Sequence, residues 1–179
     1  MFLLDTNVVS ELRKIRLGKA DAHVASWADS VEAVDLYLSV ITIQELEIGV
    51  LLAERRDAAQ GEVFRAWLGS HVMPAFSGRI LPIDTAVALC SARLHVPDPR
   101  PVRDCLIAAT ALVHGMTVVT RNVADFESTG VPVLNPWSIT AYGANDGELT
   151  EKQLTEIRKA SPQGKARRVR TRLTDERKK

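Results

Sequence analysis

The sequence predicts an α/β fold in which helices flank a mostly parallel sheet. Short apolar runs rich in β-branched residues alternate with longer segments whose apolar residues recur every three or four positions. This alternation is typical of strand–helix–strand units. A chain of 179 residues that is 46% hydrophobic can bury a sizeable single core. We therefore expect one compact domain built around one sheet.

Five strands are predicted from short apolar runs, at residues 2–4, 36–40, 79–82, 117–119 and, with a weaker pattern, 131–134. Six helices are predicted between them, at residues 8–14, 22–31, 43–56, 61–73, 84–95 and 103–114. Asp84 is placed to cap the start of one helix, and Gly115 to cap the end of the last. Three prolines in residues 96–101 exclude a helix there and indicate an extended connector.

Charge divides the chain into an acidic body and a basic tail. Residues 1–149 hold 12 Lys and Arg against 18 Asp and Glu, whereas residues 150–179 hold 11 against 4. The helical pattern weakens after Trp137, and Asn145-Asp146-Gly147 is a turn signal. We predict a domain over residues 1–142 and a basic C-terminal extension over residues 143–179 that is partly helical and then disordered.

Composition excludes several broad classes of protein. The N-terminus lacks the features of a signal peptide, and no apolar run approaches the roughly 20 residues needed to cross a bilayer. We therefore expect no membrane partner and a cytoplasmic location. Two cysteines do not make the disulfide framework of a secreted domain, and four scattered histidines offer no zinc site. Neither a G-x-G-x-x-G motif nor a Walker A loop occurs in the sequence.

Four carboxylates are predicted to meet at one edge of the sheet. Asp5 follows the first strand, and Glu45 lies early in the helix after the second. Asp104 lies in the first turn of the helix before the fourth strand, and Asp125 follows that strand. If the first strand lies between the second and the fourth, the loops of Asp5, Glu45 and Asp125 are adjacent. Asp104 joins them if its helix begins at the same edge.

Each of these acids also has a purely structural explanation. Glu45 would form a capping box with Thr42, and Asp104 would complement a helix dipole. Asp125 would close an Asx turn, and Asp5 would cap the first helix. Asp5 is the hardest to explain in this way, because it ends a strand that should be central. Four acids at one edge favour a shared function.

Clustered carboxylates restrict the chemistry of the site. Because they repel one another, either some take up protons or a cation neutralises them. Mg²⁺ prefers oxygen ligands and binds through one or two carboxylates together with substrate phosphates. Such a site suits the cleavage of phosphate esters, because the cation polarises the phosphoryl oxygen and lowers the pKa of the attacking water.

The residues around these acids resemble the motif set of the PIN-domain ribonucleases, in particular the VapC-type and FitB-like toxins of type II toxin–antitoxin pairs. The similar stretches occur in the family's order and at similar spacing over residues 1–138. They are Leu4-Asp5-Thr6-Asn7, Gln44-Glu45-Leu46, Asp104-Cys105-Leu106-Ile107-Ala108-Ala109-Thr110-Ala111, and Thr120-Arg121-Asn122 with Asp125-Phe126.

The resemblance implies a three-layer α/β/α PIN-like fold with a central, mostly parallel sheet of about five strands. It also implies a toxin that is a metal-dependent endoribonuclease, cleaving RNA with a water activated by Mg²⁺ or Mn²⁺. A homodimer and a cognate antitoxin are its implied protein partners. Asp5 and Asp104 would be the primary metal ligands, with Glu45 and Asp125 completing the acidic cluster directly or through water. The implied polar support of these ligands is Thr6, Asn7, Thr120 and Asn122.

Two other functions are compatible with parts of this pattern. A catalytically silent PIN module would bind RNA or protein, but it would not need all four acids. A phosphohydrolase of the haloacid dehalogenase type also begins with a strand and an Asp. Its chemistry needs a second Asp two residues later, where this chain has Asn7.

One residue beside the acids departs from the family pattern. Arg103 directly precedes Asp104, where the family usually has an Ala or an Asp-Ala step. A cation at this position could contact a substrate phosphate or alter the affinity for metal.

The basic tail, which extends past the family's usual end, is expected to act as an auxiliary RNA-binding arm. Residues 165–179 read KARRVRTRLTDERKK, and such a segment can contact phosphates that an acidic body repels. Truncation after residue 148 should therefore weaken RNA binding and its salt dependence. Unchanged cleavage rates and salt dependence would contradict this role, and would leave contacts with the antitoxin or a second subunit as the alternative.

Overall fold

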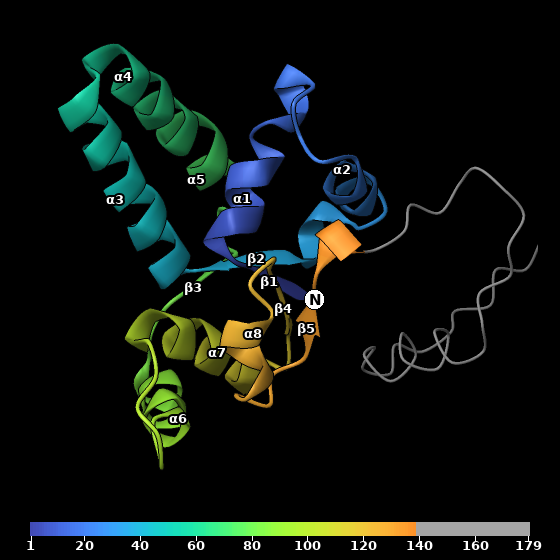
Figure 1. Cartoon of the computed structure of the whole chain (residues 1–179), viewed down its shortest axis with the longest axis vertical. Coiled ribbons are helices and arrows are strands. Elements are labelled where there is room, and N and C mark those ends of the chain that lie inside the picture. The colour runs from blue at the N-terminus through green and yellow to red at the C-terminus, as the bar shows by residue number, and fades with distance from the viewer. Residues whose placement is uncertain (139–179) are drawn as a thin grey trace, which may run out of the picture. The chain divides into compact units, whose positions relative to one another are not determined.

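The fold is an all-parallel sheet of five strands in the order β3-β2-β1-β4-β5 (Figure 1). The strands are β1 (Phe2–Leu4), β2 (Leu36–Ser39), β3 (Ile80–Leu81), β4 (Thr117–Val119) and β5 (Val133–Leu134). The computed structural model describes residues 1–138, so the predicted boundary at residue 142 and the extension over residues 143–179 lie outside the described residues. The order confirms that the first strand lies between the second and the fourth.

Helices connect the strands close to the predicted positions. They are α1 (Thr6–Leu12), α2 (Ala22–Asp29), α3 (Val40–Arg56), α4 (Ala58–Trp67), α5 (Met73–Ala75), α6 (Thr85–Leu94), α7 (Val102–His114) and α8 (Ala124–Glu127). A π-helical segment, Leu68–Val72, joins α4 to α5, and short 3₁₀ turns occupy Ile15–Leu17, Ala33–Asp35 and Pro136–Ser138. In this part of the chain, no helix is long and apolar enough to span a bilayer.

Helices cover both faces of the sheet and give it two apolar cores (Figure 1). Successive residues of a strand point to opposite faces. Leu4 and Val119 accordingly lie in one core with residues of α1 to α4, whereas Leu3 and Val118 lie in the other with residues of α7. All four side chains are fully buried. These layers confirm the three-layer α/β/α fold.

Helix caps confirm two of the sequence predictions and contradict a third. The Asp84 side chain accepts from the N–H of Val87 at 2.8 Å, and Gly115 ends α7 with a φ of 63°. The predicted capping box of Thr42 and Glu45 is wrong, because α3 begins three residues earlier than expected, with Ser39 as its cap. Thr42 is buried in the first turn and donates to the carbonyl of Leu4 instead.

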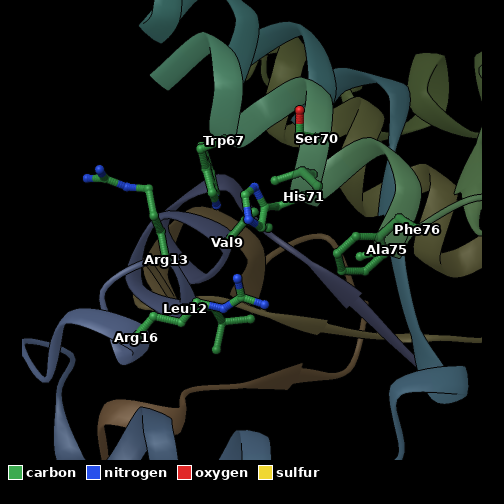
Figure 2. A pocket seen from close by; sticks show the side chains of 10 residues that line it. Val9, Leu12, Arg13, Arg16, Trp67, Ser70, His71, Ala75 and Phe76 are labelled. Atoms are coloured by element: carbon green, nitrogen blue, oxygen red, sulfur yellow. The ribbon is translucent and has the colours of Figure 1, made fainter. Parts of the chain in front are cut away.

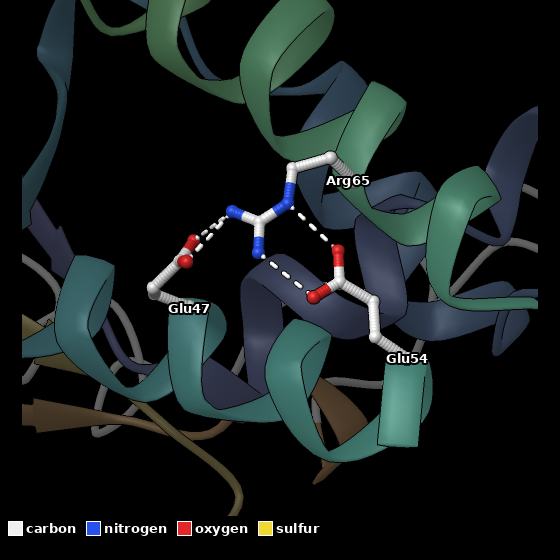
Figure 3. A network of polar contacts seen from close by, with 3 residues as sticks. All are labelled: Glu47, Glu54 and Arg65. Carbon is white, nitrogen blue, oxygen red and sulfur yellow. Dashed lines mark hydrogen bonds and ion pairs between the residues drawn. The ribbon is translucent and has the colours of Figure 1, made fainter. Parts of the chain in front are cut away.

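The α3–α4 hairpin packs with its two backbones in close contact. Gly61 is buried, and a Cβ at its position would lie 2.4 Å from the Cα of Glu54. Arg65 then joins the helices through its guanidinium, which is 2.6 Å from Glu47 and 3.0 Å from Glu54 (Figure 3). The hydrogen bonds from Arg65 hold the pKa of Glu54 below its usual range. This packing fixes α3, the helix that carries Glu45.

Replacing Gly61 with Ala should destabilise the protein, because the added methyl group meets backbone atoms of α3. We expect Gly61→Ala to lower the free energy of unfolding by about 1–3 kcal/mol, as overpacked sites do. Gly49→Ala is the matched control, since Gly49 also lies inside a helix but a Cβ added there would have nothing within 4 Å. It should raise the free energy by up to about 1 kcal/mol through helix propensity. Urea unfolding of both variants checks the prediction, and equal effects would contradict it.

Candidate active site

Asp5 places a carboxylate at the end of the central strand with little exposure to water. Its side chain is 7% exposed, and its N–H still donates to the carbonyl of Val119 in β4. One carboxylate oxygen accepts from the N–H of Thr6, at the start of α1. The other accepts from the amide of Asn7 and from the hydroxyl of Thr120, each at 2.7 Å. Asp5 therefore caps α1 and also lies at the edge of the sheet.

Thr120 organises the polar residues beside Asp5. Its hydroxyl donates to Asp5 and accepts from the Asn7 amide and from the N–H of Asn122, both at 2.9 Å. Asn7 also accepts from the N–H of Arg121 at 3.3 Å. The expected supporting residues are thus assembled, although Asn122 takes part through its backbone rather than its side chain.

Glu45 lies in the second turn of α3 and faces the same edge. One of its carboxylate oxygens accepts from the hydroxyl of Thr6 at 2.5 Å. The other is 3.2 Å from Nη1 of Arg103, at the start of α7. Because Thr6 directly follows Asp5, this contact links the first two acids.

Asp104 and Asp125 complete the set of four acids. Burial raises the pKa of Asp104, and the carboxylates of Asp125, Asp5 and Glu45 raise it further, against the opposing effect of Arg103. The pKa of Asp5 is also raised by burial, in part offset by its hydrogen bonds from Thr120 and Thr6. The carboxylates of Glu45 and Asp125 add to this increase. Since the charges act on one another, α7 begins at the expected edge.

Asp125 reaches this edge differently from the sequence-based expectation. It is exposed on α8, a helix that the sequence did not predict. Within residues 1–138 its side chain accepts no hydrogen bond, so the Asx-turn explanation is wrong. Asp125 lies in the first turn of α8, where an acid can complement the helix dipole.

The fold agrees with a comparison to known protein families. The model of the PIN domain matches residues 2–131. The chain belongs to the PIN domain family. A toxin, FitB of Neisseria gonorrhoeae, is 39% identical over 143 residues, which are 76% of this chain and 99% of that protein. A VapC ribonuclease, Y4jK of Sinorhizobium fredii, is 38% identical over 142 residues, which are 76% of this chain and 98% of that protein.

Solved structures of PIN-domain complexes have the same fold. The crystal structure of FitAcB from Neisseria gonorrhoeae superimposes with a TM-score of 0.70 at 38% identity, covering 78% of this chain and all of that one. The structure of FitAB bound to the IR36 DNA fragment gives a TM-score of 0.70 at 36% identity, covering 80% of this chain and all of that one.

The PIN-domain acids suit a hard divalent cation by their chemistry. All four offer carboxylate oxygens. Burial and, in addition, repulsion from neighbouring acids raise the pKa values of Asp5 and Asp104, and a cation would relieve this repulsion. Within residues 1–138, however, no three acidic, Cys or His side chains are grouped closely enough to hold a metal ion between them. The oxygens of Asp5 and Glu45 already accept hydrogen bonds from neighbouring side chains. One or two carboxylates completed by waters would fit a Mg²⁺ ion here.

A groove runs beside the acids of the PIN domain. Its lining includes Thr6, Glu45, Arg13 and Trp67. The last two residues also line an adjoining cavity of about 450 Å³ between α1 and the π-helical segment, into which Trp67 and His71 point (Figure 2). The Arg13 guanidinium lies 4.4 Å from the ring centroid of Phe64. The sequence did not predict this groove. The spacing of apolar residues predicts helices and their buried faces, but it does not predict where a gap remains between two packed helices.

The raised pKa of Asp104 should make stability depend on pH. The folded protein binds this proton more tightly than the unfolded chain, whose pKa is about 3.9. The proton on Asp104 therefore stabilises the fold fully below about pH 4. This stabilisation is lost as the pH rises through the raised pKa of Asp104 in the folded protein. Asp104→Asn should therefore melt a few degrees above the wild type at pH 7 without divalent cations, and this advantage should vanish near pH 4. Thermal melts across this range check it.

The control for this measurement is Asp29→Asn, at an exposed position at the end of α2. Like Asp104→Asn, it removes one negative charge, but from α2, which carries none of the four acids. A Tm difference between wild type and Asp104→Asn that is the same at every pH would contradict the prediction.

Proposed function

We propose that the chain is a metal-dependent endoribonuclease and the toxin of a type II toxin–antitoxin pair. The observation that carries this proposal is the chain of contacts at the carboxyl edge of the sheet, where Glu45 binds both Thr6, beside Asp5, and Arg103, beside Asp104. There burial, and in addition the charges of the neighbouring acids, raise the pKa values of Asp5 and Asp104. The relatives named VapC ribonuclease and FitB toxin, aligned over nearly their whole length, support the same activity.

The proposed chemistry assigns a distinct task to each group of residues. A divalent cation, Mg²⁺ or Mn²⁺, supplies Lewis-acid polarisation of the phosphoryl group and a water of lowered pKa. Asp5 and Asp104 would hold this cation, with Glu45 and Asp125 completing its surroundings directly or through water. Thr120 and Asn7 orient the Asp5 carboxylate through their hydrogen bonds, and the bond from Thr120 partly offsets the rise in its pKa that burial causes.

The proposed partners are RNA as substrate, a cognate antitoxin and a second copy of the chain. Support for the antitoxin comes from the solved neighbours, which include the two-component complexes FitAB and VapBC. Such an enzyme would act on cellular RNA in the cytoplasm.

The competing functions fit the site less well. A silent PIN module would have no reason to keep four repelling acids together, since each crowded carboxylate costs stability. A haloacid dehalogenase-like phosphohydrolase needs a carboxylate two residues after Asp5. That place is held by Asn7, whose side-chain amide donates to Asp5 and has no titratable proton to give or take.

A cleavage assay with Asp5→Asn tests the proposal. We expect the variant to cleave structured RNA in Mg²⁺ or Mn²⁺ more than about 100-fold slower than the wild type, because even outer partners of metal ligands cost about 10–100-fold when removed. Chelation of divalent cations should abolish the wild-type activity. The Asn side chain retains an oxygen that can cap α1, so the variant should still fold.

Asp29→Asn provides the control and should cleave at the wild-type rate. Equal activity of the wild type and Asp5→Asn would falsify the catalytic assignment. Expression in a bacterial host separates a toxin from a housekeeping nuclease: the wild type should arrest growth, and Asp5→Asn or co-expression of a cognate antitoxin should relieve the arrest.

A further inference from the structure

Arg103 is a cation within the acidic cluster, and it belongs to this chain rather than to a ligand. It is the second residue of α7 and directly precedes Asp104. Its Nη1 lies 3.2 Å from Glu45 on α3, and its side chain is 57% exposed. Among the residues described, this is the only ion pair made by any of the four acids.

The helix itself does not explain a cation at this position. The first turn of a helix carries the positive end of its dipole, which favours acids and disfavours basic residues. Asp104 satisfies this preference, whereas Arg103 opposes it. The charge of the adjacent Asp104 attracts the Arg103 guanidinium, and Glu45 on α3 supplies its one ion pair among the described residues.

The pair leaves Glu45 with both oxygens occupied. Oε2 accepts from the Thr6 hydroxyl and Oε1 faces Arg103. A divalent cation at Oε1 would share that oxygen with the guanidinium and would repel its positive charge. A cation that binds at Glu45 therefore competes with Arg103.

The displaced guanidinium would still lie beside the acids and would be free to bind an anion. Only Nη1 of Arg103 has a partner within residues 1–138, which leaves most of its five N–H groups open to solvent. Exposed ion pairs contribute little to stability, so this one can exchange partners readily. A phosphate is the natural replacement, because guanidinium groups bind it through two parallel hydrogen bonds.

We propose that Arg103 contacts a phosphate of the RNA substrate and that Glu45 is its partner only while the site is without a divalent cation. The proposal rests on the ribonuclease function given above. Glu45 holds the guanidinium at the acids in the free protein and releases it when a cation competes for Oε1. Cation binding and RNA binding then strengthen each other through Arg103, and by linkage the two effects are equal in size.

Binding measurements without cleavage test this exchange. The probes are Mn²⁺ and a short, single-stranded 2′-O-methyl oligoribonucleotide, whose length is checked on a gel after each titration because a metal-activated water could still cleave it. Calorimetry gives the Mn²⁺ affinity with and without the oligonucleotide, and a titration across salt concentrations gives the oligonucleotide affinity with and without Mn²⁺. The proteins are the full-length wild type, Arg103→Gln and Arg103→Lys.

Arg103→Gln should bind Mn²⁺ alone up to about fivefold more tightly than the wild type, because the competing ion pair is gone. In Mn²⁺ it should bind the oligonucleotide about tenfold more weakly, as expected for one lost contact to a charged group. Its plot of log affinity against log salt should be shallower by about 0.7, the value for one phosphate contact on a single strand. Arg103→Lys should recover the salt slope but only part of the affinity.

Arg56→Gln is the matched control, since Arg56 is exposed at the last turn of α3, roughly 16 Å along that helix from Glu45. It should leave both affinities unchanged. If Arg103→Gln matches the wild type in oligonucleotide affinity and salt slope, while the wild type binds both probes, the exchange is wrong and the ribonuclease proposal stands. If the wild type binds neither probe, both proposals fail together.

Discussion

The carboxylate of Asp5 lies 7% exposed at the end of the central strand, where three donors replace the water it has lost. A buried charge without such partners would take up a proton or destabilise the fold. The donors come from α1 and from the end of β4, so the position of Asp5 depends on the pairing of β1 with β4 and on the start of α1. The fold and the site are therefore specified by the same few hydrogen bonds.

The two oxygens of Asp5 have different hydrogen-bond partners. One oxygen accepts from the N–H of Thr6, which begins α1, and the other accepts from the side chains of Asn7 and Thr120. Capping thus needs only half of the carboxylate. Thr6 adds a second link, because its hydroxyl reaches Glu45 on α3. A change in the position of α3 would therefore move or break the hydrogen bond between Glu45 and Thr6, next to Asp5 at the end of the central strand.

The parts of the site that sequence predicts are those that depend on strand order. An acid directly after a strand must lie at the carboxyl edge of a parallel sheet, which places Asp5 without knowledge of any side-chain contact. Glu45 was placed at this edge because it follows the second strand closely, and the competing explanation of a capping box is wrong, since Ser39 and not Thr42 caps α3. A Thr three residues before a Glu near the start of a helix fits a capping box, but the same spacing also occurs when the Glu faces another part of the fold. The tertiary contacts of the Glu distinguish the two cases. The ion pair of Glu45 and Arg103 joins residues 58 positions apart, which no local pattern specifies.

The acidic body poses an electrostatic problem for a protein that acts on a polyanion. Residues 1–149 carry more acids than bases, and the cations nearest the four acids already have partners. Arg103 pairs with Glu45, Arg13 stacks on Phe64, and Arg121 lies over the ring of Trp137. RNA is repelled by such an edge unless positive charge is added there by a bound cation or made available there by an arginine that loses its acidic partner. A divalent cation does both if it displaces Arg103 from Glu45, because the bound ion and the freed guanidinium then face the same phosphates.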